Sequence, residues 1–340
     1  MSLPPRVLEP PFNITRASHV VLDVRDLTAS RRFYTEVLGL IVTLETDDAL
    51  YLRGLEEACH HSLVLRRSPG PAVCQRIGLR VLTELDLEKA HAELPRRGCA
   101  VQWAELPHQG RTLHVTDPFG FRLELCAHMP VQPRSITRFH DQRGGSAMRL
   151  DHFQLLTPSL RDALNFYMQF GFWLTEYVGK DDDHIRAVFL QRKGNPHDVV
   201  IFNGDGPRLH HLAYTVPDAQ HLLRACDVAG ELGYGRKVER GPGRHGPGHA
   251  MFVYFRDPDG HRVELFNTHY QVMDLENEPI RWDPDDPAVA FPWGLPAQRR
   301  WFDQATPMAD TPVSKTSPPP NPVTLERFLA EQGEAAGSVE

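Results

Sequence analysis

Three residues of types that bind metal ions lie far apart in the second half of the sequence, each inside a short apolar run. They are His152 in RLDHFQLL, His211 in RLHHLAY and Glu264 in HRVELF. Side chains alternate between the two faces of a strand, so three neighbouring strands could direct two imidazoles and one carboxylate toward a common point. Such a set leaves three coordination positions open, as in non-haem Fe(II) oxygenases. Because the chain has 18 histidines, this spacing alone also allows them to be structural histidines.

The segments that must position these residues belong to an internal repeat. The first half contains RASHVVLDVRDLTASRRFYTEVLGL at 16–40, and the second contains RLDHFQLLTPSLRDALNFYMQFGF at 149–172. Each copy opens with an apolar run that carries a histidine, His19 or His152, and continues to an FY pair and a glycine. Apolar residues of the second copy recur at i, i+3, i+4 and i+7, which predicts one face of a helix: Leu160, Ala163, Leu164 and Tyr167.

The two halves also close in the same way. HVTDPFGFRLEL at 114–125 and VYFRDPDGHRVEL at 253–265 both read as a strand, an Asp-Pro-x-Gly turn and a second strand. Helical patterns are expected near 85–97 and 217–229, with short strands rich in β-branched and aromatic residues between the repeated parts. The sequence therefore predicts an α+β protein with two pseudo-equivalent domains that meet near 140–150.

The first half lacks a complete set of ligands. His19 parallels His152 and Glu124 parallels Glu264, but Gly78 or a neighbour occupies the position that matches His211. Two ligands would hold a metal ion poorly. We therefore expect a structural role for the first domain and a catalytic role for the second.

A longer string before Glu264 is more specific. Gly243-Arg244-His245 is followed, after a gap of seven residues, by Val253-Tyr254 and then by DPDG and Glu264. This string resembles the signature of type I extradiol ring-cleavage dioxygenases of the vicinal oxygen chelate superfamily. That signature has G-x-H, a gap of five to seven, an apolar residue, Tyr, an acidic or similar residue, Pro, x, Gly and Glu, and every constrained position is met. The resemblance covers about residues 14–301.

The resemblance implies a fold of two tandem vicinal-oxygen-chelate domains (glyoxalase/bleomycin-resistance-like) made of paired βαβββ modules, with a C-terminal extension. The expected boundaries are 14–130 for the structural N-terminal domain and 148–270 for the catalytic C-terminal domain. A segment at 271–305, rich in Pro and Trp, would serve as a lid or a subunit contact. The tail at 306–340 is expected to be mostly disordered because it has few apolar residues.

The resemblance also assigns roles to single residues. The metal ligands are His152, His211 and Glu264. The catalytic residues are His197 as acid/base, Tyr254 as hydrogen-bond partner of a catecholate oxygen, and His245 in the loop over the substrate. The substrate-binding residues are Arg240, Gln154 and Phe189. The adjacent His210 is expected to point to the opposite face of its strand as a structural residue.

The implied reaction is the extradiol cleavage of a substituted catechol by O2, which gives a muconic semialdehyde-type product in aromatic degradation. The implied cofactor is Fe(II), and Mn(II) is possible because the same ligands accept both ions. Alternatives are cleavage of 3,4-dihydroxyphenylacetate itself, another metal-dependent activity of the superfamily, such as a glyoxalase-like reaction, or a metal-free binding protein of the bleomycin-resistance type. The intact triad and its proton-handling neighbours argue against the last.

Three departures from the family pattern concern the substrate. Gln154 replaces an Asn, Phe189 replaces a Trp, and Val289 and Ala290 stand where relatives that cleave homoprotocatechuate have an Arg pair that grips the substrate carboxylate. A buried carboxylate without its donors is unfavourable. We expect a catechol with a neutral or apolar substituent, although a neighbouring arginine, Arg299 or Arg300, could compensate.

Composition excludes several other classes of partner. The net charge is −7, with both signs interspersed, so nucleic acid and anionic membranes are not expected partners. No run approaches the length of a membrane span, and MSLPPRVLEPPF lacks the layout of a signal peptide. The odd number of cysteines, five without a CxxC, predicts reduced thiols in the cytoplasm. Relatives are multimers, so a homo-oligomer, tetramer or dimer, is expected.

Overall fold

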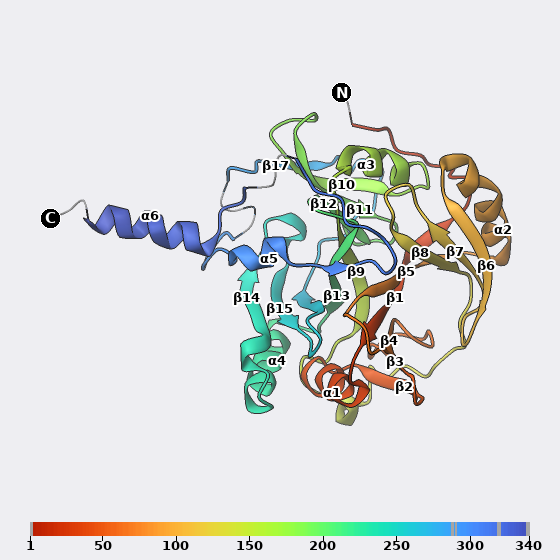
Figure 1. Ribbon diagram of the computed structural model, residues 1–340, viewed down its shortest axis with the longest axis horizontal. Coiled ribbons are helices and arrows are strands. Elements are labelled where there is room, and N and C mark those ends of the chain that lie inside the picture. The colour runs from red at the N-terminus through yellow and green to blue at the C-terminus, as the bar shows by residue number, and fades with distance from the viewer. Residues whose placement is uncertain (1–2, 287–288, 290, 318–320, 338–340) are drawn as a thin grey trace.

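The computed structural model describes residues 3–286, 289, 291–317 and 321–337. Its strands form two mixed sheets, one from each half of the sequence (Figure 1). The first sheet has the order β2 (Ile41–Glu45), β3 (Ala49–Arg53), β4 (Leu63–Arg67), β1 (Ile14–Val24), β5 (Cys74–Val81), β8 (Arg122–Cys126), β7 (Gly110–Thr116), β6 (Ala100–Leu106). The second has the order β14 (Val238–Arg244), β15 (Met251–Arg256), β16 (Arg262–Asn267), β13 (Arg208–Thr215), β9 (Arg149–Thr157), β12 (Val199–Asn203), β11 (Ile185–Gln191), β10 (Trp173–Gly179), β17 (Ile280–Trp282).

Each sheet contains two copies of one unit. β1 pairs in parallel with β4 and antiparallel with β5. β9 pairs in the same two ways with β12 and β13. The second unit of each half repeats the parallel pairing, β5 with β8 and β13 with β16. Every unit is thus a strand, a helix and three strands, which confirms the predicted α+β fold of paired βαβββ modules.

The helix of each module follows its first strand. The four are α1 (Leu27–Arg32), α2 (Glu84–Glu93), α3 (Leu160–Met168) and α4 (Ala219–Glu231). Thr83 begins α2 with a capping box to Asp86, and Asp218 accepts two backbone N–H groups at the start of α4. The apolar face predicted for the second repeat is buried along α3.

Two buried tyrosines join the halves, and each comes from the repeated FY pair. The Tyr34 hydroxyl donates to Asp257 at 3.1 Å, and the Tyr167 hydroxyl donates to Asp117 at 2.7 Å. Each aspartate opens the Asp-Pro-x-Gly turn of the opposite half. The repeat therefore supplies two equivalent contacts across the boundary between the domains.

The segment that follows β16 extends the second sheet and packs onto it. β17 lies beside β10 in parallel, and α5 (Arg299–Asp303) brings the buried Trp301 ring to 4.5 Å from the ring of His210. β18 (Thr306–Pro307) then pairs with the start of β13.

The predicted disorder beyond residue 306 is wrong for the first part of the tail. Met308 and Ala309 are buried, Asp310 forms an ion pair with Arg122, and Ser314 pairs with Gly206 through the backbone. This stretch has few apolar residues, so composition suggested disorder. It is held instead by main-chain hydrogen bonds and charges at strand edges, which composition does not report.

The chain ends in α6 (Leu325–Gly337), which projects away from both sheets (Figure 1). Within the described part of the chain, no helix combines the length and the apolar character needed to cross a membrane.

The buried contact between Asp117 and Tyr167 makes stability depend on pH. Burial raises the pKa of Asp117 to about 6, against the opposing effect of its hydrogen bonds. A carboxyl with a higher pKa in the folded than in the unfolded chain binds more protons when folded, so its contribution to stability falls as pH rises from about 4 to 6. Asp117→Asn removes this titration and keeps an acceptor for the N–H groups of Phe119 and Phe121. We expect the free energy of unfolding of the variant minus that of the parent to increase by roughly 2–3 kcal/mol between pH 4 and pH 7.

Urea denaturation of the metal-stripped proteins at several pH values measures this difference. Glu45→Gln, which changes an exposed carboxylate paired with Arg31, is the matched control. The difference in free energy of unfolding between this variant and the parent should change little with pH. A difference between Asp117→Asn and the parent that stays constant with pH would contradict the raised pKa.

Candidate metal centre

The structure brings the three predicted metal ligands together on one face of the second sheet. His152, His211 and Glu264 lie on the neighbouring strands β9, β13 and β16. One oxygen of Glu264, Oε2, is 3.4 Å from His152 Nε2 and 3.2 Å from His211 Nε2. All three side chains are buried, and one donor atom of each lies within 4.8 Å of the others.

The donor atoms fit a divalent transition-metal ion. His211 Nε2 is buried and has no hydrogen-bond partner within the described residues. Burial is the largest influence on the pKa of His211 and lowers it to about 4, so the ring is neutral and can offer a lone pair. Burial would raise the pKa of Glu264, but contacts with His152 and His211 outweigh it and keep this pKa well below its usual value. A single ion with bonds of about 2.0–2.2 Å could satisfy imidazole and carboxylate donors at these separations.

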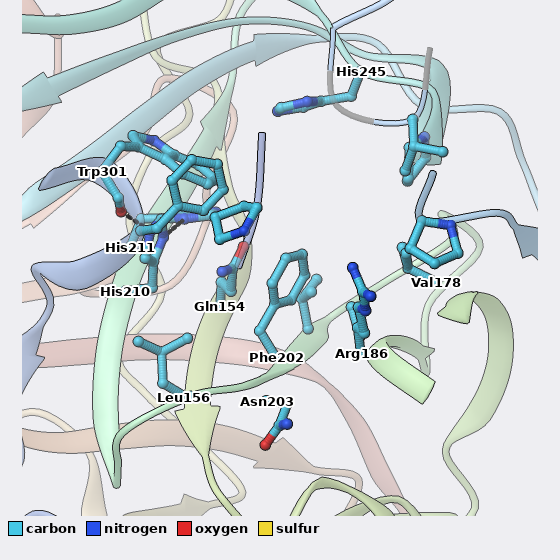
Figure 2. Close-up of a pocket in the computed structure, with 18 of the residues that line it drawn as sticks. Gln154, Leu156, Val178, Arg186, Phe202, Asn203, His210, His211, His245 and Trp301 are labelled. Carbon is cyan, nitrogen blue, oxygen red and sulfur yellow. Dashed lines mark hydrogen bonds between the residues drawn. The ribbon is translucent and has the colours of Figure 1, made fainter. Parts of the chain in front are cut away.

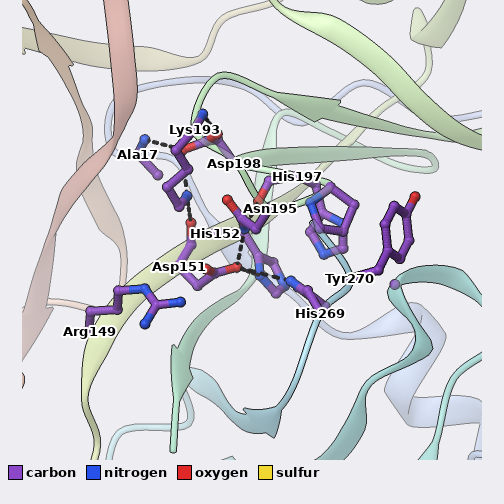
Figure 3. A network of polar contacts seen from close by, with 12 residues as sticks. Ala17, Arg149, Asp151, His152, Lys193, Asn195, His197, Asp198, His269 and Tyr270 are labelled. Carbon is purple, nitrogen blue, oxygen red and sulfur yellow. Dashed lines mark hydrogen bonds and ion pairs between the residues drawn. The ribbon is translucent and has the colours of Figure 1, made fainter. Parts of the chain in front are cut away.

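Asp151 orients the first ligand. Its Oδ2 is 3.0 Å from His152 Nδ1, so the carboxylate accepts the Nδ1 proton and His152 Nε2 remains directed at Glu264. Asn195 donates to the same oxygen at 2.8 Å, as Figure 3 shows. Burial would raise the pKa of Asp151, but Lys193 and the neighbouring histidines outweigh it and hold this pKa well below its usual value.

His197 lies beside the first ligand, two residues before β12. Its ring meets that of His152 edge-on at 4.4 Å, and Phe189 lies 5.3 Å away on another side. Burial, followed by the nearby His269 and His152, lowers the pKa of His197 well below its usual value. The side chain is therefore a neutral, buried imidazole that can take up or release a proton next to the metal ligands.

Tyr254, His245 and Arg240 form another side of the site. The Tyr254 hydroxyl is 2.9 Å from His245 Nε2, and the His245 ring stacks on Phe252 at 3.9 Å. Burial, and then the charge of Glu264, raises the pKa of Tyr254 well above its usual value, so it stays protonated. The Arg240 guanidinium lies over the Trp301 ring at 4.4 Å, which places a buried positive charge near these residues.

His210 does not have the predicted orientation. We expected it to face away from His211, but it lines the same cavity, and its Nδ1 lies 2.7 Å from His211 Nδ1. The pairing of β13 with β9 shifts register between Leu209 and His211. Such an irregularity interrupts the alternation of faces, so two successive side chains can reach one site.

Sequence reasoning missed His269, which is buried and packs against His197 at 4.3 Å between ring centroids. Its Nδ1 is 3.4 Å from Asp151, and with His152 and His197 it forms a second group of close donor atoms. The only signal in the sequence is its place five residues after Glu264, just past the end of the same strand.

Glu176 was also missed. Its carboxylate is buried and accepts hydrogen bonds from the backbone of Gly248 at 2.8 Å, the hydroxyl of Tyr270 at 2.9 Å and the indole of Trp282 at 2.6 Å. Burial raises its pKa. These donors belong to the loop after His245 and to two parts of the segment after β16. Glu176 therefore joins three stretches of chain that contribute residues to the lining of the cavity.

The metal centre lies in a cavity of about 830 Å³ (Figure 2). Gln154 and Phe189, both predicted to bind substrate, line it. One wall is a cluster of apolar side chains, here called the apolar wall: Val178, Ala187, Phe189, Val200, Phe202 and Val289. Ala290, also singled out in the sequence, lies outside the described residues.

The N-terminal domain has no complete counterpart of the triad within the described residues. In the C-terminal domain, Ala213 pairs with His152 on one neighbouring strand and with Glu264 on the other. In the N-terminal domain, Gly78 pairs with His19 and Glu124 in the same way, so Ala213 and Gly78 occupy equivalent places. The residue that matches His211 is therefore Arg76, two positions earlier, and not Gly78. His19 Nε2 contacts Glu124 directly at 2.5 Å. A Cβ at position 78 would lie 2.2 Å from the His19 ring, so packed side chains fill this site.

Comparisons with known proteins agree with this architecture. Residues 16–125 and 149–265 each match the Glyoxalase/Bleomycin resistance protein/Dioxygenase superfamily. The chain is 28% identical over 316 residues to a manganese-dependent 2,3-dihydroxybiphenyl 1,2-dioxygenase of Geobacillus genomosp. 3, with 88% of this chain and 98% of that protein covered. It is 28% identical over 325 residues to a metapyrocatechase of Geobacillus stearothermophilus, with 90% and 98% covered.

A solved structure is similar over nearly the whole chain. A variant of homoprotocatechuate 2,3-dioxygenase from B. fuscum superposes with a TM-score of 0.88 at 33% identity, covering 92% of this chain and 89% of that one.

The difference between the two domains predicts where metal binds. Glu264→Gln replaces a charged ligand by a neutral amide of the same shape, and Glu124→Gln makes the same change in the N-terminal domain. We expect Glu264→Gln to weaken Zn²⁺ binding by at least about 100-fold, because even loss of a ligand's hydrogen-bond partner typically costs 10–100-fold. Glu124→Gln should keep the parent's affinity and its single ion per chain. Competition with a chromophoric chelator measures both, and equal losses in the two variants would contradict the assignment.

Proposed function

Because the chain belongs to the Glyoxalase/Bleomycin resistance protein/Dioxygenase superfamily, we propose that its metal centre carries out the extradiol cleavage of a catechol by O2. The ring opens next to the two hydroxyls and both oxygen atoms enter the product, a muconic semialdehyde-type compound of aromatic degradation. The observation that carries this function is the complete set of His152, His211 and Glu264 in a buried cavity that also holds His197 and Tyr254.

The proposed cofactor is Fe(II), with Mn(II) as the alternative that a relative named manganese-dependent supports. His152, His211 and Glu264 would hold the ion. When bound, it lowers the pKa of the catechol hydroxyls and connects the electron-rich ring with O2.

His197 is the proposed acid/base. It is neutral and buried beside His152, so it can accept a proton released in the cavity and return it to the oxygen being reduced. Phe189 packs close to its ring and limits the access of water on that side.

Tyr254 and His245 are proposed to hold the catechol in one orientation. Their mutual hydrogen bond fixes the Tyr254 hydroxyl, which stays protonated and can donate to a catecholate oxygen. Arg240 supplies a nearby positive charge, which favours the deprotonated form of the bound catechol.

A metal-free binding protein of the same fold is a weaker candidate. In such a protein the buried Nε2 of His211 would keep no hydrogen-bond partner among the described residues, which is unfavourable. Another metal-dependent reaction of the superfamily would use the triad, but it would not require the His197, Tyr254 and His245 set around it.

The substituent on the catechol is proposed to be neutral and apolar. Val289 belongs to the apolar wall, where an arginine would be needed to bind a carboxylate. Arg299 lines the cavity, but its Nε is engaged with Asp303 at 2.9 Å, so it is poorly placed to substitute for that arginine. The wall instead offers apolar surface to an alkyl or aryl group.

Assembly and location remain proposals of the same kind. We propose a homo-oligomer, dimer or tetramer, in the cytoplasm, with 271–305 acting as a cover or a subunit contact. The five cysteines are unpaired, which suits a reducing compartment.

A panel of catechols tests the function and the substrate together. The anaerobically purified, Fe(II)-loaded protein should consume oxygen and form yellow product with 3- and 4-alkylcatechols, and should do so slowly with 3,4-dihydroxyphenylacetate. Absence of oxygen uptake with every catechol, despite one bound ion per chain, would contradict extradiol cleavage.

A substitution in the apolar wall sharpens this test. Val289→Arg should raise the ratio of kcat/KM for 3,4-dihydroxyphenylacetate to that for 4-methylcatechol by about 10-fold or more, since a charge-assisted hydrogen bond contributes roughly 1.5–3 kcal/mol. Val289→Leu is the control and should leave the ratio low. Rapid turnover of 3,4-dihydroxyphenylacetate by the parent would keep the reaction and refute the proposed substituent.

Removal of the acid/base should slow the reaction without preventing substrate binding. His197→Asn is expected to lower kcat by about 100-fold or more, because a positioned acid/base typically contributes 10²–10⁴-fold. Anaerobic titration with catechol should give a dissociation constant close to that of the parent. His184→Asn, an exposed histidine between β10 and β11, is the control, and an unchanged kcat in His197→Asn would exclude the role.

A further inference from the structure

The residue before the second metal ligand is itself a histidine with two polar contacts. His210 Nδ1 lies 2.7 Å from His211 Nδ1, and His210 Nε2 lies 2.9 Å from the main-chain oxygen of Trp301. Both imidazoles are buried. Figure 2 shows His210, His211 and Trp301 together on one side of the cavity.

The chemistry of these contacts allows one arrangement of protons. A carbonyl oxygen only accepts hydrogen bonds, so His210 must carry its proton on Nε2 and donate it to Trp301. The 2.7 Å contact between the two Nδ1 atoms needs one donor and one acceptor. A histidine that offers the lone pair of Nε2 to a metal ion carries its own proton on Nδ1, so His210 Nδ1 is the acceptor. His211 must therefore donate from Nδ1, which leaves the lone pair of its Nε2 directed toward Glu264.

We propose that His210 is a positioning residue that fixes the tautomer and the ring orientation of the metal ligand His211. The constraint starts at the main-chain carbonyl of Trp301 and passes through the His210 ring to His211. This inference concerns the metal centre and rests on the proposed function only for the presence of a metal. It does not depend on which catechol is the substrate.

The first ligand has an equivalent arrangement with a different acceptor. Asp151 directly precedes His152 and accepts its Nδ1 proton, as His210 directly precedes His211. A carboxylate accepts in either orientation and needs no further support. A neutral imidazole accepts at Nδ1 only while its other nitrogen holds the proton, so His210 depends on Trp301.

The carbonyl of Trp301 is itself held in place. Arg262 donates to this oxygen at 3.1 Å and to the main-chain oxygen of His210 at 3.2 Å. Arg262 is buried and paired with Glu239 at 2.6 Å. The helix α5, remote in sequence from the ligands, therefore takes part in preparing one of them to bind metal.

Three variants separate this role from general packing. His210→Phe keeps a ring but cannot accept a hydrogen bond, and His210→Asn keeps an acceptor close to the position of Nδ1. The matched control is His60→Phe, because His60 Nδ1 lies 3.1 Å from His61 Nδ1 in the N-terminal domain, away from the metal centre. If His210→Phe does not fold, His210→Gln replaces it, since its side chain places no acceptor at the Nδ1 position.

Zn²⁺ affinity is the first measurement, by competition with a chromophoric chelator. We expect the dissociation constant to rise about 10–100-fold in His210→Phe, in line with the usual effect of losing a ligand's hydrogen-bond partner. It should stay within about threefold of the parent in His210→Asn, because the acceptor that the ligand needs is retained. The His60→Phe control should leave it unchanged.

The second measurement observes the tautomer directly and needs neither metal nor activity. Two-bond ¹⁵N–¹H NMR correlations of the metal-free, histidine-labelled protein should place the His211 proton on Nδ1 in the parent and in His210→Asn. They should show loss of this preference in His210→Phe. Unchanged Zn²⁺ affinity in His210→Phe, equal losses in the Phe and Asn variants, or an Nε2 proton on His211 of the parent would each overturn the proposal.

Discussion

His152 on β9 and Glu264 on β16 both pair with the same residue of the strand between them, Ala213 on β13. His211 lies two residues before Ala213 and therefore on the same face. This register turns three residues that are remote in sequence into one group of donor atoms. A slip of one residue in either pairing would direct a ligand to the opposite face of the sheet. The parallel pairing of β13 with β16 and its antiparallel pairing with β9 are thus the constraint on which the group of donor atoms and the cavity around it depend.

The N-terminal domain supports this register, and it has no complete set of donor atoms among the described residues. The backbone N–H of Ala17 donates to Asp198, the neighbour of His197, and the two Tyr–Asp contacts clamp the halves from both sides. In its own sheet, the His19 ring packs directly against Gly78 and contacts Glu124, so it fills the space that a metal site would need. Among the described residues, the complete set of donor atoms is thus found in only one of the two copies of the fold.

Sequence could predict what depends on periodicity and on spaced motifs. The repeat predicted two equivalent domains, and the family resemblance implied that each is a pair of modules. Alternation along strands predicted that His152, His211 and Glu264 could share a common face. It could not predict the orientation of His210, which depends on an irregularity in the pairing of β13 with β9. Nor could it predict the match of Arg76 to His211, which depends on the registers of pairing between strands that are remote in sequence. Glu176 and His269 were missed because their partners come from segments remote in sequence. The ordered tail was missed for a similar reason, since main-chain hydrogen bonds leave no trace in composition.

Glu176 gives a mechanical property to the three stretches of chain that it joins beside the cavity. Its two oxygens receive donors from Gly248, Tyr270 and Trp282, which lie on separate stretches of chain. If one stretch moved alone, it would leave a buried carboxylate with fewer partners, and a charged group that loses a hydrogen bond in the interior costs roughly 1–3 kcal/mol or more. Separate movements are therefore penalised, while a joint movement that lets water reach the carboxylate is not. The three stretches are coupled through one charge, so they should open as a single cooperative unit.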